Sequence, residues 1–384
     1  VSLTDSRTSR VLWSERRAFA QDEMREIGRD IVIGVLASIG EPATDEEKRI
    51  IGGGFPSSAE AYEEFLTGNA QLARRSPPSI ESALHHYRRA SELDTKFAAA
   101  LARQAYGYAV LVDWGWKPSK DLPADMLSEG MLLADRAIGL DSTSADAWLA
   151  RAYILRQRDP RKFAGSIEAF EHAITLDPYN AEAFHQYGQA LMALGRYTEA
   201  YAAYRRSLDL EPGRATELVP MAALDERRGR LHEGTVLLDS AVAAAPQVGY
   251  VRAMRSMFRS QAGNFKGAQD DATDALALDS SYRMPGLTAL ARSLWLAGDK
   301  SRALTVVAEA ERSVSNPSAP DPTEAFWLAM AEVATQRPEK AVTLLRNSKP
   351  RGAWLWFYFG ASDLNEFRKR PEVSELMAEL DPRR

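Results

Sequence analysis

Apolar residues recur at intervals of three and four positions over most of the chain, in stretches that glycine or proline interrupts. Between residues 181 and 212, Phe184 and Leu191 lie on one face of a predicted helix. Gly195 is expected to end this helix, because glycine adopts the left-handed cap conformation at little cost. A second helix then runs to Pro212. Neither helix can bury its apolar face alone, so the pattern predicts helix pairs that stack on their neighbours.

The helix-pair pattern returns every 34 or 35 residues. A ladder of glycines marks the turn inside each pair, at Gly195, Gly229, Gly263 and Gly298. A second ladder of small residues begins at Ala173 and keeps the same period and phase. Two ladders in register indicate tandem repeats rather than separate domains.

The unit from 181 to 212 resembles the tetratricopeptide repeat. In that family, large residues occupy the positions of Phe184 and Tyr204, and proline occupies the position of Pro212. Degenerate units extend the pattern in both directions, so that about eight repeats cover residues 59 to 348. The resemblance implies an all-α fold, a superhelical solenoid of helix-turn-helix units.

One repeat departs from the others, the unit that begins at Gly249. Arg252 stands where its first large residue is expected, and Ala272 stands where its second is expected. Looser packing is therefore predicted for this repeat.

The segment before the repeats has a different pattern. Residues 1 to 40 contain a predicted short strand, Val11-Leu12-Trp13, followed by an amphipathic helix. They resemble the end of the TolB-like amino-terminal domain, which precedes tetratricopeptide arrays in many bacterial signalling proteins. The residues that carry this resemblance are Asp5, Thr8, Leu12, Trp13, Glu15, Asp22 and Glu23. It implies a small α/β remnant, the C-terminal fragment of such a domain, whose upstream part lies outside this chain.

Two further segments flank the array. Residues 41 to 58 are expected to form a hinge, because Gly52-Gly53-Gly54 lies between two predicted helix starts. Residues 349 to 384 are expected to cap the last helix pair with an apolar inner side and a polar outer side. A ligand pocket under Trp354 and Trp356 stays open as the alternative reading of that segment.

The composition limits the chemistry that the chain can perform. The sequence holds 48 Lys and Arg against 53 Asp and Glu, and a net charge of −5 gives no support to a nucleic-acid or membrane surface. It holds no cysteine, and its five histidines lack the spacing of a zinc-hydrolase helix. The longest apolar run, Ile31 to Ile39, is shorter than the roughly 20 residues that cross a bilayer. We therefore expect a cytoplasmic protein without enzyme activity, cofactor or metal, and without contact to membrane or nucleic acid.

The resemblance also implies where a partner binds. In the tetratricopeptide family, the first helix of each repeat lines the concave wall at its second, fifth, ninth, twelfth and thirteenth positions. On this sequence, these positions give the predicted partner-binding groove: Tyr106, Tyr153, Arg156, Gln157, His185, Gln189, Met192, Glu226, Arg227 and Met257. Aromatic, methionine and hydrogen-bonding side chains suit an extended peptide or a partner helix. Each of them has an ordinary alternative, a solvated or a packing role.

A longer connection interrupts the array. Ala90 and Ala137 occupy equivalent positions but are 47 residues apart, and the extra residues fall around Trp114 and Trp116. Insertions in repeat proteins emerge as loops. These two tryptophans either cover exposed repeat edges or form an anchor for a partner.

Two functions of different classes fit these features. The first is a non-catalytic scaffold, the repeat module of a larger bacterial signalling protein, which docks a peptide or protein partner in its groove. The second is a small-molecule-sensing regulatory module linked to a cyclase, kinase or DNA-binding output domain. Assembly into a homo-oligomer stays open beside both. The groove positions favour the first.

Overall fold

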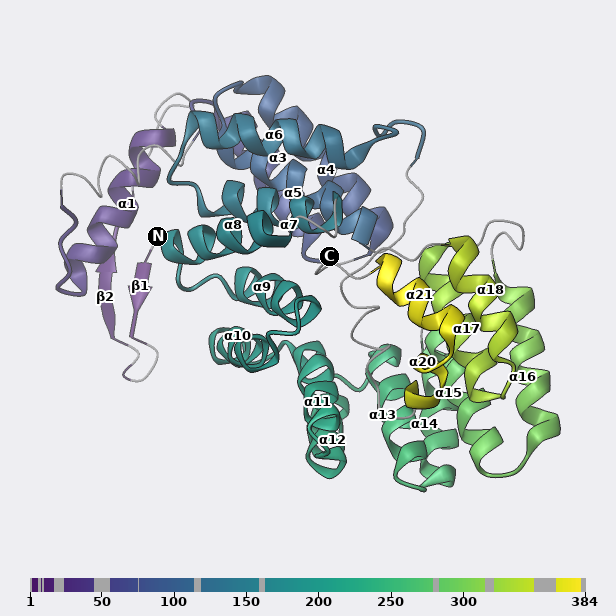
Figure 1. The fold of residues 1–384 in the computed structure, drawn as a ribbon. Helices are drawn as coiled ribbons and strands as arrows, with labels where there is room; N and C mark the ends of the chain where they lie inside the picture. The colour runs from purple at the N-terminus through teal and green to yellow at the C-terminus, as the bar shows by residue number, and fades with distance from the viewer. Residues whose placement is uncertain are drawn as a thin grey trace. The chain divides into compact units, whose positions relative to one another are not determined.

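The computed structural model describes residues 2–5, 8, 10–16, 24–44, 56–74, 76–113, 119–158, 163–278, 283–314, 321–348 and 364–380. Helices make up most of this part of the chain (Figure 1). Its sheet consists of two antiparallel strands, β1 (Ser2–Thr4) and β2 (Val11–Ser14), and helix α1 (Met24–Ser38) follows them. The structure confirms the all-α fold and the strand and helix predicted near the N-terminus.

Eight helix pairs follow one another along the described residues, as the sequence period predicts. Their first helices are α3 (Ala59–Leu72), α5 (Ala98–Asp113), α7 (Ala145–Arg158), α9 (Ala181–Ala193), α11 (Leu218–Arg227), α13 (Gly249–Gln261), α15 (Arg283–Leu296) and α17 (Pro322–Ala334). Their second helices are α4 (Pro77–Leu93), α6 (Met126–Leu140), α8 (Phe163–Leu176), α10 (Tyr197–Leu210), α12 (Leu231–Ala244), α14 (Phe265–Leu278), α16 (Lys300–Ser313) and α18 (Pro338–Ser348). A 3-10 turn, η3 (Ala215–Glu217), leads into α11, and α20 (Asn365–Arg368) and α21 (Pro371–Leu380) follow the last pair.

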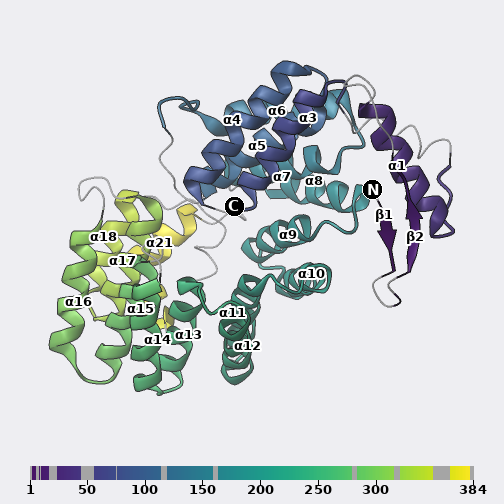
Figure 2. The same cartoon turned by 180° about the vertical axis from the view of Figure 1, so that it is seen from behind.

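The chain divides into two compact units. Unit 1 comprises Val1–Ile154 with Thr175–Asp177, and unit 2 comprises Leu155–Ile174 with Pro178–Arg384. In unit 1, helices α3 to α6 pack against one another in chain order. In unit 2, each first helix from α9 to α17 packs on its own second helix, and α13, α15 and α17 also pack side by side (Figures 1 and 2). The first helices therefore form one layer of unit 2 from α13 to α17, and the second helices form another.

The pair α9–α10 shows how the sequence sets each repeat. The side-chain oxygen of Asn180 accepts a hydrogen bond from the backbone N–H of Ala183 at 3.0 Å, which starts α9. Gly195, with a φ of 75°, follows the end of α9 in the left-handed region that glycine tolerates. A Cβ on Gly188 would lie 3.0 Å from the ring of Tyr204. The two helices can thus pack closely only because a small residue faces a large one.

The apolar core of unit 2 is continuous along the array rather than gathered at one centre. Its buried residues extend from Val219 in α11 to Leu345 in α18. The same cluster includes Phe367 of α20 and Val373 of α21. Helix α21 packs against α18, so the described end of the predicted capping segment lies against the last helix pair.

Candidate functional site

A hydrogen-bonded network joins the first helices α7 and α9 to the start of α11. The Nη1 atom of Arg156 donates to Oε1 of Gln189 at 2.6 Å, and the amide nitrogen of Gln189 lies 2.7 Å from Nε2 of His185. The Nδ1 atom of His185 lies 2.6 Å from Oε2 of Glu217. Arg214 closes the network through its Nε atom, which donates to Oε1 of Glu217 at 2.9 Å. We call these five residues the polar network.

Glu217 is the charged centre of the polar network, and its side chain is fully buried. Burial alone would raise the pKa of Glu217, but His185 and Arg214 outweigh it and hold that pKa below its usual range. Arg214 also donates to Oε2 of Glu182 at 2.5 Å. A buried carboxylate is tolerated when it is paired and hydrogen-bonded, and both conditions are met here.

The donors and acceptors of the polar network settle the orientation of its members. Arg156 can only donate, so the carbonyl oxygen of Gln189 must face it and the amide N–H groups must face His185. The Nε2 atom of His185 therefore accepts, and its Nδ1–H donates to Glu217. The His185 ring is therefore held in one orientation by Gln189 of its own helix and Glu217 of the next repeat.

The ten predicted groove residues fall into two classes by exposure. Tyr106, Tyr153, Arg156, Met192 and Glu226 are buried. Gln157, His185, Gln189, Arg227 and Met257 are half-buried. The half-buried set lies entirely in unit 2, and we call it the first-helix face. A partner can touch these five side chains directly, whereas the buried ones act by shaping the surface around them.

The buried tyrosines of the predicted groove belong to unit 1. The hydroxyl of Tyr153 donates to Oδ2 of Asp113 at 2.8 Å, and the ring of Tyr106 lies 5.6 Å from that of Tyr153. The ring of Tyr153 is fully enclosed. These contacts give both residues a packing role within unit 1.

Further along unit 2, the predicted groove residues are again held by neighbours. The Nη1 atom of Arg227 donates to the hydroxyl of Tyr197 at 2.6 Å, and its guanidinium group lies 4.9 Å from the centre of that ring. Gln261 of α13 donates to Oε1 of Glu226 in α11 at 2.8 Å. Successive first helices are therefore linked by polar side chains beyond the polar network.

Some predicted features lie outside the described residues. They include Trp114 and Trp116 of the predicted anchor loop, and Trp354 and Trp356 of the alternative ligand pocket. Within the described ranges, no group of three histidine or carboxylate side chains is arranged to hold a metal ion. In the same ranges, no helix combines the length and the apolar character needed to cross a bilayer.

A cleft of about 420 Å³, which no sequence pattern indicated, lies at helices α16, α17 and α18. Three carboxyl groups line it, those of Glu311, Glu339 and the almost fully buried Glu332. Burial raises the pKa of Glu332 to about 7, and a hydrogen bond to Glu311 adds to the effect. At the same cleft, the Nζ atom of Lys340 donates to Oε1 of Glu311 at 2.9 Å. The pKa of Glu311, in contrast, is lowered, because hydrogen bonds to Lys340 and Glu332 outweigh the effect of burial.

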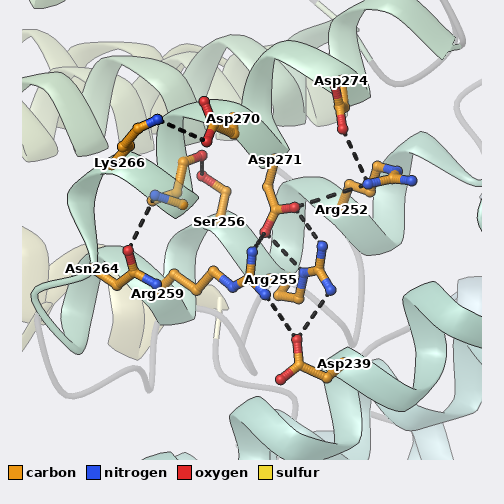
Figure 3. Close-up of polar contacts among 12 residues, drawn as sticks. Asp239, Arg252, Arg255, Ser256, Arg259, Asn264, Lys266, Asp270, Asp271 and Asp274 are labelled. Carbon is orange, nitrogen blue, oxygen red and sulfur yellow. Dashed lines mark hydrogen bonds and ion pairs between the residues drawn. The ribbon is translucent and has the colours of Figure 1, made fainter.

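The repeat formed by α13 and α14 contains a cluster of ion pairs (Figure 3). Arg252, Arg255 and Arg259 lie along α13 and face Asp271 of α14, with nitrogen–oxygen distances of 4.0, 2.5 and 3.0 Å. Asp239 of α12 accepts from Arg255 and Arg259, at 3.0 Å in each case. Charged groups thus fill the space beside α13, where the pattern of the other repeats places large apolar residues.

Two kinds of residue escaped the sequence analysis. Glu217 and Arg214 complete the polar network but lie in the turn before α11, outside the five groove positions. Their spacing of three residues at a helix start, nearly one repeat after His185, is the signal that could have found them. Arg255 and Asp271 could have been found by following the departure at Arg252 along its helix.

Comparison with known proteins identifies the repeat. Residues 181–214, which comprise α9, α10 and the turn after them, match the family model described as Tetratricopeptide repeat. This helix pair is similar to a tetratricopeptide repeat. We refer to all eight helix pairs as the tetratricopeptide array, after the one pair that the family model matches.

Several solved structures are similar to this chain at low sequence identity. The hetero-tetramer Cut9-Hcn1 of the APC/C is 15% identical, with a TM-score of 0.54, and the match covers 89% of this chain and 61% of that chain. Yeast Tom70 is 18% identical, with a TM-score of 0.49 and coverages of 83% and 68%. YrrB, described as a TPR protein with an unusual peptide-binding site, is 17% identical, with a TM-score of 0.36 and coverages of 53% and 96%. No curated protein sequence matches this chain.

Proposed function

We propose that the tetratricopeptide array is a non-catalytic scaffold, and that its first-helix face binds an extended segment of a protein partner. The observation that carries this proposal is Gln189, whose amide bridges Arg156 on one repeat and His185 on its own helix. The bridge holds His185 in one orientation while 15% of the histidine side chain stays exposed. A side chain that is already ordered loses little conformational entropy when a partner binds.

The polar network is more than packing requires. Burying polar groups costs free energy unless every one of them is hydrogen-bonded, and apolar residues would fill the same positions without that cost. Retention of five mutually bonded polar groups on one side of the first helices is therefore better explained by recognition than by stability. This reasoning supports the first-helix face over the second-helix side as the binding surface.

The chemistry of the first-helix face favours the backbone of a peptide. Gln157 and Gln189 carry amide groups, which both donate and accept hydrogen bonds, as the peptide backbone does. Met257 adds a flexible apolar surface. Arg156 and Arg227, which could have gripped a carboxylate, already donate to Gln189 and Tyr197. We therefore propose recognition of an extended peptide backbone.

The wider setting is part of the same proposal. We infer a module of a larger bacterial, cytoplasmic signalling protein, because residues 1–40 resemble the end of a TolB-like domain. In this arrangement residues 41–58 form a hinge, residues 59–348 form the array, and residues 349–384 cap it. Strand β2 and helix α1 at the predicted positions support that reading.

A peptide-selection experiment tests the proposal. The intact chain is immobilised and panned against a random peptide library, and the selected peptides are titrated by calorimetry against wild type, Gln189→Ala and Gln269→Ala. Gln269 is a half-buried glutamine on the second helix α14, so its substitution is the matched control. We expect Gln189→Ala to weaken binding about tenfold or more, and Gln269→Ala to leave it unchanged. Failure to select any peptide, or equal binding by both variants, would refute the first-helix face as the site.

A further inference from the structure

The chain's own residues after the last helix pair already occupy part of unit 2. Leu364 and Phe367 are buried, and Phe367 is only 5% exposed. Both belong to the same apolar cluster as Met254 of α13 and Leu287 of α15. Helices α20 and α21, in yellow, lie beside α15 and α17 in Figure 1. The segment from Leu364 to Arg370 therefore folds back on the array instead of extending from its end.

Arg368 brings this segment to the side of the predicted groove. Burial lowers the pKa of Arg368, while the carboxylate of Glu226 in α11 and the hydroxyl of Tyr197 act in the opposite direction. Glu226 also accepts a hydrogen bond from Gln261 of α13 at 2.8 Å. Burial lowers the pKa of Arg292 in α15 to about 10, and the charge of Glu226 acts against this lowering. Glu226 is thus hydrogen-bonded to α13 and acts electrostatically on Arg292 of α15 and on Arg368 of the returning segment.

Helix α20 has one inner and one outer side. Phe367 is buried and Arg368 is half-buried, whereas Glu366 and Lys369 are exposed and pair with each other at 2.6 Å. The segment is tied to the last helix pair by Arg370, whose Nη2 atom donates to Glu339 of α18 at 2.9 Å. An aromatic side chain followed by an arginine therefore makes the inner contact.

A simple cap does not need this arrangement. Helix α21 already covers α18 with Val373 and Leu376, which are buried in the common core. Stability at the end of the array requires no charge next to Glu226, which lies three repeats earlier in the sequence. The position of Arg368 is therefore unexplained by capping, although it is what a ligand of the first helices would provide.

We propose that the segment Leu364–Arg370 is a built-in competitor for the first-helix side of α11, α13 and α15, and that a partner displaces it with the same chemistry, an aromatic side chain followed by an arginine. This inference rests on the proposed function, and it names the partner's side chains. A competitor in the same chain lowers the apparent affinity for any partner by the fraction of molecules in which the site is open. Weakening the competitor must therefore strengthen binding from outside.

The experiment uses the intact chain and a fluorescein-labelled synthetic peptide with the sequence of Leu364–Val373. Its dissociation constant is measured by fluorescence anisotropy for wild type and for two double variants. The test variant is Phe367→Ala/Arg368→Ala, and the matched control on the outer side of the same helix is Glu366→Ala/Lys369→Ala. We expect the test variant to bind the peptide about tenfold more tightly than wild type or more, and the control to match wild type.

Two further variants keep the inference open to refutation. Adding Glu226→Gln to the test variant is expected to remove most of the gain, because the peptide's arginine then lacks its charged partner. If Phe367→Ala/Arg368→Ala unfolds, Arg368→Glu retains the aromatic anchor and is expected to bind the peptide more tightly than wild type. A dissociation constant equal to that of wild type, in whichever variant circular dichroism shows to be folded, would overturn the inference.

The two experiments distinguish a wrong competitor inference from a wrong proposed function. The selection experiment depends on Gln189 in α9, and the anisotropy experiment depends on Glu226 and the returning segment. Library peptides that lose affinity with Gln189→Ala, together with unchanged anisotropy, would refute the competitor alone. Tighter binding by Phe367→Ala/Arg368→Ala, together with an indifferent Gln189→Ala, would refute the site proposed on the first-helix face.

Discussion

Replacement of Asp271 by alanine is expected to destabilise the array far more than loss of an exposed charge. The Asp271 side chain is 3% exposed and accepts hydrogen bonds from Arg255 at 2.5 and 2.8 Å (Figure 3). Arg259 adds an ion pair at 3.0 Å. Hydrogen bonding and ion pairing with Asp271 and Asp239 outweigh burial and raise the pKa of Arg255 above its usual value. Without Asp271, three neighbouring guanidinium groups would repel one another in a largely dry environment.

The structure sets the size of the effect. Removal of one partner from a buried ion pair typically costs about 3–5 kcal/mol. Arg255 and Arg259 keep Asp239 as a second partner, so we expect a cost of about 3 kcal/mol for Asp271→Ala. Asp274, which is 59% exposed and contacts Arg252 alone within the cluster at 3.2 Å, serves as the control. Asp274→Ala is expected to cost less than about 1 kcal/mol, because water screens exposed pairs.

Urea unfolding followed by far-ultraviolet circular dichroism measures both variants. A loss of about 3 kcal/mol lowers the midpoint by about 1 M or more at the urea sensitivity usual for proteins. A double-mutant cycle of Asp271→Ala with Arg255→Met then isolates the pairwise term, for which we expect about 1–3 kcal/mol. Equal midpoints for Asp271→Ala and Asp274→Ala, or a cycle that sums to zero, would show that this cluster does not hold the repeats together.

Three further predictions concern packing and pH. Gly188→Ala places a Cβ about 3.0 Å from the Tyr204 ring. It is expected to lower the free energy of unfolding, measured by urea titration, by about 1–3 kcal/mol. An unchanged urea midpoint would contradict the close packing of Gly188 against Tyr204. The pKa of Glu332 is raised to about 7, so the wild-type chain loses stability as pH rises from about 4.5 to 7. Glu332→Gln should remove that loss and be more stable than wild type by about 1–3 kcal/mol at pH 8. An unaltered pH profile of stability would contradict the raised pKa of Glu332. Glu217 has a lowered pKa, so its stabilising effect is complete above about pH 4.5 and is lost as pH falls further. The thermal midpoint of Glu217→Gln should therefore vary less with pH in the acid range than that of wild type. Parallel pH profiles of the two proteins would contradict the ion pairs assigned to Glu217.

The repeats were predictable because their signals are local. Gly195 ends a helix through its own backbone conformation, and Asn180 starts one through a side chain three residues from its partner. Gly188 and Tyr204 are only 16 residues apart, in two helices joined by a short turn. Interactions of this range depend on the composition of one unit, so the period and the helix limits followed from the order of residues alone.

The candidate site was predictable only in part. His185 and Gln189 were expected on the groove side because the resemblance to the tetratricopeptide family places them there. That Gln189 reaches back to Arg156, and that His185 reaches forward to Glu217, depends on how far each repeat is rotated against the next. No pattern inside one repeat specifies this rotation, since it emerges from the packing of many side chains at once.

In residues 364–380 as well, the sequence predicted the local structure but not the long-range packing. The apolar spacing of Val373 and Leu376 indicated a helix that covers the last pair, and α21 does pack there. The return of Phe367 to a core shared with Met254, more than three repeats earlier in the sequence, could not be foreseen. The proximity of Arg368 to Glu226 depends on how all the intervening helix pairs stack, which no pattern inside one repeat specifies.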